Sequence, residues 1–185
     1  ILLNEAKLFS EWYATRKINK FKIRKFKKVF ENEVKKLLSK LNFKNDTFVH
    51  RDFHVSNLMY VKNNIAVIDS QDALIGNKAY DLASLIDDVR FETSNKLKNK
   101  ILNNYFKKLK KTEINNFVND FEILSVLRHL KIIGIFTRLA LRDNKKKYVK
   151  MIPYAWEMIN YRMKKNREFV NLKLILKRNF PKFVK

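Results

Sequence analysis

Most of the chain shows the apolar spacing of amphipathic helices. Apolar residues recur every three or four positions in successive segments, and lysines occupy the opposite faces. This spacing predicts helices over residues 5–18, 21–41, 82–89, 101–109, 113–141, 151–165 and 169–177. Pro153 falls near a predicted helix start, where its missing N–H is harmless. Since no repeat and no Ser/Gly linker interrupts the pattern, we expect a single, mostly helical domain.

One short segment breaks the helical spacing and predicts a β-hairpin. Residues 58–61 and 65–68 are apolar runs rich in β-formers, and the polar residues 62–64 between them suit a tight turn. Asn57 precedes the first run and Asp69 follows the second, so antiparallel pairing would bring both to the open end. Because neighbouring strands lie about 5 Å apart, two oxygen ligands there could share one cation.

Asp52 lies on the loop that leads into this hairpin and could face the same point. Phosphoryl transfer requires a carboxylate that orients and deprotonates the attacking hydroxyl, and oxygen ligands that hold magnesium on the phosphates. Asp52, Asn57 and Asp69 would supply both. Each acid alone is compatible with a polar loop beside an ordinary hairpin, whereas the set at this spacing favours a catalytic site.

The sequence around these residues resembles a known enzyme family. It reads H-R-D-F-H-V-S-N-L-M from His50, I-D-S-Q-D-A from Ile68 and Y-D-L-A-S-L from Tyr80. The first motif and the strand-end Asp are similar to the protein-kinase catalytic loop and metal-binding Asp. The form found here is more similar to the aminoglycoside phosphotransferase and choline kinase superfamily. Segments 2–13, 120–139 and 142–148 further resemble bacterial anomeric kinases of N-acetylmuramate and N-acetylglucosamine.

The resemblance covers nearly the whole chain and implies a fold. That fold is α+β and mostly helical, the C-terminal lobe of a protein kinase-like phosphotransferase with a small β-hairpin carrying the metal site. It implies that Asp52 is the catalytic base and that Asn57 and Asp69 bind Mg²⁺. Asp72 would lie near the acceptor sugar or support the loop. Ser70 departs from the family, whose members often carry an aromatic residue after the metal-binding Asp.

Other residues are expected to support the site or to bind the acceptor. His50, Arg51 and Asp81 would be structural, with Asp81 placed to cap a helix start and to brace the catalytic loop. His54 is polar enough to line the acceptor pocket, and a structural role stays equally open. On the predicted helix 113–141, His129 is expected to have a core or helix-surface role, whereas Arg128 could meet an anionic sugar substituent such as a lactyl carboxylate.

The chain has only two glycines, Gly76 and Gly134, so it has no glycine-rich loop to cover ATP phosphates. The resemblance begins at the helical lobe. We therefore expect residues 1–185 to be the C-terminal lobe of a longer kinase, with the N-terminal nucleotide lobe absent. Alone, this lobe is expected to turn over poorly or not at all.

The expected activity is ATP- and Mg²⁺-dependent transfer to a sugar hydroxyl. The favoured acceptor is the anomeric hydroxyl of N-acetylmuramate or N-acetylglucosamine, in the recycling of cell-wall sugars. Two alternatives stay open. One is a kinase for another small alcohol or an aminoglycoside, and the other is a catalytically inactive free-standing lobe with a binding role.

Composition adds three expectations. The net charge of +23 is spread along the chain as lysines beside many Asn and Ile residues, a pattern that an AT-rich genome produces, so nucleic acid is not the expected partner. The lack of cysteine fits a reducing cytoplasm. Residues 123–141 are apolar, but Arg128, Lys131 and Arg138 would cost about 9 kcal/mol in a membrane. This segment is therefore expected to be a buried helix and not a membrane span.

Overall fold

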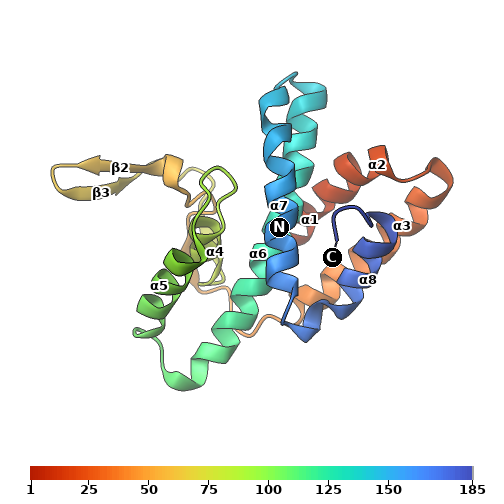
Figure 1. Cartoon of the computed structure of the whole chain (residues 1–185). Helices are drawn as coiled ribbons and strands as arrows, with labels where there is room; N and C mark the ends of the chain where they lie inside the picture. The colour runs from red at the N-terminus through yellow and green to blue at the C-terminus, as the bar shows by residue number, and fades with distance from the viewer. Residues whose placement is uncertain (185) are drawn as a thin grey trace. The chain divides into compact units, whose positions relative to one another are not determined.

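A computed structural model describes residues 1–184, which form helices and two small β-sheets (Figure 1). The residues gather into two compact units. One unit contains Ile1–Lys40 and the residues from Val126 onward, and the other contains Leu41–Ser125. Helix α6 (Ile114–Arg142) contributes to both. The hydrophobic pattern does not reveal this division, because the apolar stripe of α6 continues across the boundary.

The first unit is helical, as the apolar spacing predicted. Its N-terminal helix begins as α1 and continues through a π-helical turn, η1, in which the backbone makes one wider turn. The elements besides the second part of α6 are α1 (Leu2–Leu8), η1 (Phe9–Tyr13), α2 (Ala14–Lys17), α3 (Lys20–Leu38), η4 (Lys146–Met151), α7 (Ile152–Met163), η5 (Arg167–Phe169) and α8 (Val170–Asn179).

Aromatic side chains form the core of this unit. The Phe9 ring lies 5.3 Å from that of Phe180, 5.5 Å from that of Phe30 and 5.7 Å from that of Trp156, measured between centroids. At the same place Gly134 brings two helices into backbone contact, since a Cβ on this glycine would overlap the carbonyl carbon of Leu8. The core therefore requires a glycine where α6 crosses the end of α1.

The second unit combines short helices with the two sheets. Besides the first part of α6, its helical elements are η2 (Val55–Asn57), α4 (Tyr80–Ile86), α5 (Asn95–Phe106) and η3 (Lys111–Glu113). The short strand β4 (Leu74–Gly76) lies in a segment for which the sequence pattern predicted neither a helix nor a strand. This strand pairs antiparallel with β1 (Thr47–Val49). Three residues are too few to show the alternation by which a strand is recognised in a sequence.

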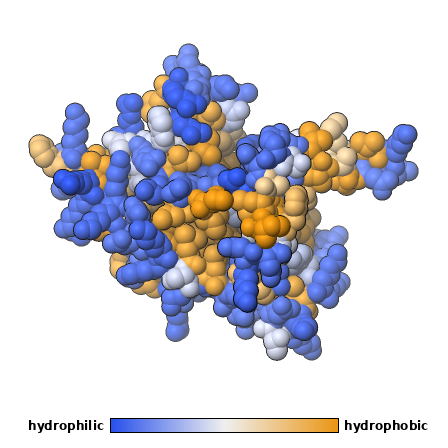
Figure 2. Space-filling model, turned by 180° about the vertical axis from the view of Figure 1, so that it is seen from behind, coloured by the Kyte–Doolittle hydropathy of each residue, from blue (hydrophilic) through white to orange (hydrophobic). Residues whose placement is uncertain are grey.

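The other sheet is the predicted hairpin, formed by β2 (Leu58–Val61) and β3 (Asn64–Val67). Lys62 and Asn63 form the two-residue turn with φ angles of 45° and 65°, as the twist of a tight hairpin requires. The hairpin extends away from α4 and α5 (Figure 1) and carries exposed hydrophobic residues (Figure 2). Tyr60 is 72% exposed and Ile65 is 61% exposed. This ribbon therefore has little apolar packing of its own.

The apolar part of α6 behaves as the sequence predicted. Within residues 1–184, no helix combines the length and the apolar character needed to cross a membrane.

Candidate active site

Strand β1 leads directly into the loop that carries Asp52, and Asp81 braces this loop. Asp81 lies in the first turn of α4, and its two carboxylate oxygens accept hydrogen bonds from consecutive backbone N–H groups. The N–H of His50 lies 2.6 Å from Oδ2, and the N–H of Arg51 lies 3.0 Å from Oδ1. Arg51 has a φ of 71°, a left-handed conformation that is costly for a residue with a side chain. The two hydrogen bonds to Asp81 therefore stabilise a loop conformation that is unfavourable for Arg51 on its own.

The side chains of His50 and Arg51 connect the loop to the segment after the hairpin. His50 Nε2 donates to the carbonyl oxygen of Ile68 at 3.0 Å, and Arg51 Nη1 donates to the carbonyl oxygen of Asp72 at 3.1 Å. Asp69 lies between these two attachment points. The chain on each side of Asp69 is thus fixed to the loop of Asp52.

Asn57 makes a second connection, from the hairpin back to Asp52. Its Nδ2 donates to the backbone carbonyl of Asp52 at 2.9 Å, and the N–H of His54 donates to the same oxygen at 3.0 Å. The Asp52 side chain is half-buried, and within residues 1–184 no group donates to its carboxylate. These hydrogen bonds hold the loop through the backbone of Asp52 and not through its carboxylate.

Asn57 and Asp69 meet at the open end of the hairpin. The backbone N–H of Ile68, the residue before Asp69, donates to the carbonyl oxygen of Asn57 at 3.1 Å, so the pairing extends beyond the last residues of the strands. Asp69 is exposed and has a φ of 69°. Its Oδ1 accepts a hydrogen bond from Gln71 Nε2 at 2.8 Å. The structure thus places Asn57 and Asp69 at the same end of the hairpin, and their role as metal ligands stays a prediction.

The donors at this end of the hairpin fit magnesium. Because Asn57 uses its Nδ2 on the loop, the amide oxygen is the atom left for a ligand, and Asp69 adds a carboxylate oxygen. Hard oxygen donors are those that Mg²⁺ prefers, and it commonly binds one or two protein groups together with water and phosphate. No group of three His, Cys, Asp or Glu side chains suited to a metal occurs in the described part of the chain. A cation here would therefore need phosphate oxygens to complete its shell.

The proposed acceptor-binding residues lie in different surroundings. The Asp72 side chain is exposed, whereas His54 is buried at the start of the η2 turn and its carbonyl accepts the N–H of Asn57 at 2.9 Å. Arg128 belongs to the part of α6 in the first unit, where it is buried and its Nη1 has no hydrogen-bond partner within residues 1–184. Their roles toward an acceptor stay predictions.

Three residues that support the candidate site were not identified from the sequence. Gln71 contacts the Asp69 carboxylate, and Asn77 and Asp120 form a buried hydrogen-bonded pair close to the start of α4. Asp120 had one recognisable signal. It lies on the same helix face as Phe117, Phe121 and Leu124, which are all buried, and a carboxylate among such neighbours is usually held by specific donors.

The loop, the hairpin and their brace are matched by a known family. Residues 3–113 match the sequence profile of the phosphotransferase enzyme family, and the chain belongs to this family. The N-acetylmuramate/N-acetylglucosamine kinase of Neisseria meningitidis serogroup B is 34% identical over 177 residues, which are 92% of this chain and 52% of that protein. The kinase of the same name from Pseudomonas aeruginosa is 30% identical over 182 residues, which are 93% of this chain and 53% of that protein. The chain thus spans about half the length of the curated relatives it matches.

Proposed function

We propose that this chain provides the catalytic base and the metal ligands of a sugar kinase. The observation that carries the proposal is the position of Asp52. Its carboxylate accepts no hydrogen bond within residues 1–184, while its backbone is joined through Asn57 to the hairpin end that bears Asp69. The reaction would transfer the γ-phosphoryl group of ATP to the anomeric hydroxyl of N-acetylmuramate or N-acetylglucosamine, the sugars named for the relatives.

The residues have separate tasks in this reaction. The acceptor hydroxyl oxygen forms a bond to the γ-phosphorus as the bond from that phosphorus to the β–γ bridging oxygen breaks, and ADP leaves. Asp52 orients the hydroxyl and takes its proton. Asn57 and Asp69 would hold Mg²⁺, which supplies positive charge beside the phosphate oxygens. Asp81, His50 and Arg51 keep the carboxylate and these ligands in register, because positioning is most of what phosphoryl transfer requires of a protein.

The proposal includes a nucleotide-binding lobe that these residues do not supply. The glycine-rich loop of kinases is not found in the sequence, and the relatives are about twice as long as the part that matches. We therefore expect catalysis from a longer protein that contains this chain, and little or none from residues 1–185 alone. ATP as the phosphoryl donor would place the reaction in the cytoplasm.

The decisive experiment is phosphorus NMR on the longest reading frame that contains the chain, incubated with Mg²⁺, ATP and a panel of amino sugars and aminoglycosides. We expect a sugar-1-phosphate signal that Asp52→Asn weakens about 10²- to 10⁴-fold, the usual contribution of a general base. Asp46→Asn is the matched control, since Asp46 is an exposed carboxylate just before β1. Nucleotide affinity should be unchanged in both variants.

The other outcomes separate the alternatives. A phosphate ester on a different hydroxyl would keep the kinase and replace the proposed acceptor. Full turnover in Asp52→Asn would refute the base. No product with any acceptor would refute the proposed activity and favour a binding role.

A further inference from the structure

Asp120 is a buried carboxylate that accepts N–H donors from two separate segments, residues 42–43 and Asn77. It has no exposed surface. Its Oδ1 accepts from the backbone N–H of Asn42 at 2.8 Å, and its Oδ2 accepts from the backbone N–H of Phe43 at 2.9 Å and from Asn77 Nδ2 at 2.7 Å. The side-chain amide of Asn42 also donates to Oδ1, at 3.0 Å. Several N–H donors can offset the cost of burying one negative charge. The carboxylate in turn holds the segments that carry these donors in defined positions.

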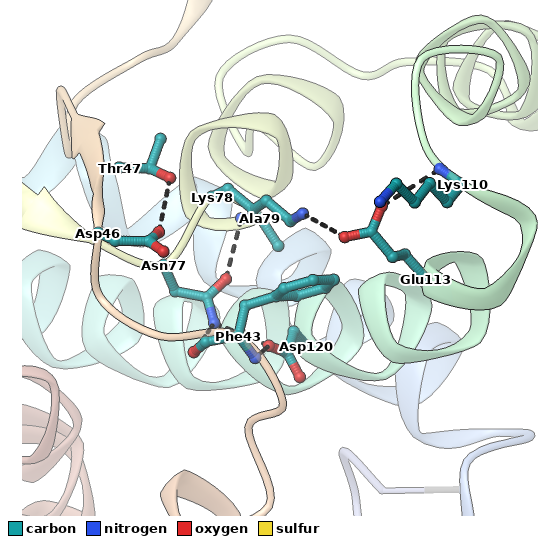
Figure 3. A network of polar contacts seen from close by, with 9 residues as sticks. All are labelled: Phe43, Asp46, Thr47, Asn77, Lys78, Ala79, Lys110, Glu113 and Asp120. Carbon is teal, nitrogen blue, oxygen red and sulfur yellow. Dashed lines mark hydrogen bonds and ion pairs between the residues drawn. The ribbon is translucent and has the colours of Figure 1, made fainter.

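The segments held by Asp120 flank one end of the β1–β4 sheet. Asn42 and Phe43 precede β1, Asn77 directly follows β4, and Thr47 pairs with Gly76 at this end of the sheet. Lys78 adds a contact between the same segments, because its Nζ lies 3.7 Å from the centre of the Phe43 ring. Figure 3 shows the side chain of Asn77 close to Phe43 and Asp120, and Lys78 reaching Glu113. The opposite end of the same sheet continues into His50 and Arg51.

Asn77 also fixes the start of α4. Its Oδ1 accepts from the backbone N–H of Ala79 at 3.0 Å, and its carbonyl oxygen accepts from the N–H of Tyr80 at 3.0 Å. The next residue is Asp81, which accepts the two N–H groups of the catalytic loop. A continuous series of hydrogen bonds and chain connections therefore runs from Asp120 through Asn77 and Asp81 to the loop that carries Asp52.

We propose that Asp120 is a positioning residue for Asp52. It sets both the start of β1, which delivers the loop, and the start of α4, which braces it. This inference rests on the proposed function for its catalytic meaning, whereas its structural part concerns only contacts within residues 41–125. A purely structural carboxylate would stabilise the whole unit without a particular effect on the N–H groups of His50 and Arg51. The two roles therefore predict different amide exchange.

The test compares hydrogen exchange, read by NMR, in the wild-type chain, in Asp120→Asn and in Asp46→Asn. Asp120→Asn keeps the shape but places an NH₂ group against N–H donors. The amides of His50 and Arg51 should then exchange about tenfold faster or more, the size expected when a hydrogen bond to a charged group is lost. The amides of Leu172 and Leu176 in α8 should keep their wild-type rates. Asp46→Asn makes the same chemical change in the same segment at an exposed position and should alter neither set.

An exchange pattern of another kind would overturn the proposal. If the His50 and Arg51 amides of Asp120→Asn exchange at wild-type rates, the hydrogen bonds from Asp120 through Asn77 and Asp81 do not influence the loop. Equal acceleration across the whole of residues 41–125 would show a general stabilising role. If Asp120→Asn does not fold, Asn77→Ser supplies the same comparison, because it removes the amide that links Asp120 to α4.

A double substitution that swaps the two side chains provides a second test. In Asp120→Asn/Asn77→Asp the amide and the carboxylate swap places, so one hydrogen bond between the two side chains is restored. Protection of the His50 and Arg51 amides should return in part, and its absence would contradict the coupling of Asp120 to Asn77.

In the longer enzyme, Asp120→Asn should lower kcat while KM for ATP changes less than about twofold, since the groups that position the base act on the chemical step. A raised KM with unchanged kcat would refute positioning of the base. Altered amide exchange without any kinase activity would leave the hydrogen-bond series intact and refute only the proposed function.

Discussion

The backbone N–H of Arg51 donates to Asp81 Oδ1 at 3.0 Å, across thirty positions of sequence, while Arg51 holds a φ of 71°. The two facts belong together. A left-handed residue on a loop persists only where surrounding contacts compensate for its cost, and such residues gather at functional sites. The unfavourable backbone of the loop is thus stabilised by a single carboxylate from the first turn of α4.

Replacing Asp81 by Asn should therefore destabilise the second unit. One of the two acceptor oxygens becomes an NH₂ group, and a hydrogen bond to a charged group contributes about 2 kcal/mol. We expect the free energy of unfolding, measured by urea denaturation, to fall by about this amount. Asp72→Asn is the control, because its exposed carboxylate is not used by the loop. Equal losses in the two variants would contradict the role of Asp81 as a brace.

Asp69→Asn should change the magnesium dependence of the longer enzyme. The substitution keeps the size of the side chain and one oxygen but removes its negative charge, so the Mg²⁺ concentration for half-maximal rate should rise about tenfold or more. Gln71→Ala tests the neighbour that contacts Asp69 without being a ligand, and a smaller shift is expected. A normal metal titration in Asp69→Asn would remove Asp69 from the metal site.

Gly134→Ala should strongly destabilise the first unit. A methyl group would overlap the carbonyl carbon of Leu8 and lie 2.6 Å from the backbone nitrogen of Phe9, so two helix backbones must separate. We expect a loss of about 3 kcal/mol, which exceeds the gain of about 1 kcal/mol in helix propensity. Gly76→Ala meets only side chains, at 3.0 Å and 3.1 Å, and should cost less. Thermal unfolding of both variants checks the order.

Lys98 and Asp87 form a buried ion pair in the second unit, with Nζ 2.8 Å from Oδ1. Ser125 donates to the other oxygen at 2.7 Å. Lys98→Met leaves a buried charge and should cost about 3–5 kcal/mol, as other broken buried pairs do. Asp87→Asn/Lys98→Met should cost less than the sum of the single changes by about 1–3 kcal/mol. Strict additivity in denaturant unfolding would show that the two charges are not coupled.

Glu33 gives a pH-dependent prediction. The residue is buried on α3, and burial raises the pKa of its carboxyl, an effect that Lys36 partly opposes. The folded state therefore holds this proton to higher pH than the unfolded chain does, so the ionised form lowers stability as pH rises above the unfolded pKa. Glu33→Gln should stabilise the chain at pH 7, and the gain should disappear in acid, where both forms are neutral.

The control for Glu33→Gln is Glu11→Gln, which alters net charge equally at an exposed position. Urea unfolding at several pH values supplies the comparison. A stability difference that does not vary with pH would contradict the assignment to Glu33.

The sequence predicted those features that repeat or that lie close together in the chain. The helices follow from apolar spacing, and the hairpin follows from two apolar runs with a polar turn, so the sequence alone was enough to pair Asn57 with Asp69. Strand β4 could not be foreseen, because three residues carry no periodicity.

Long-range hydrogen bonds were the harder part. Asp120 lies 78 positions from Asn42 and 43 from Asn77, and no local spacing indicates such partners. The same is true of the division into two units, since α6 runs through both as one regular helix. The sequence did show a carboxylate on a buried helix face. Such a group implies hydrogen-bond donors nearby, but the sequence does not identify which residues supply them.

The exposed hairpin has a consequence for the energetics of the site. A two-stranded ribbon with little buried apolar surface is marginally stable on its own, so β2 and β3 should open locally before the helices around them. Asn57 precedes β2 and Asp69 follows β3, so the two residues lie at the same end of the hairpin only while the strands are paired. A ligand that contacts both residues would therefore bind only the paired form of the hairpin. Its measured affinity would depend on the free energy of strand pairing as well as on the contacts with Asn57 and Asp69.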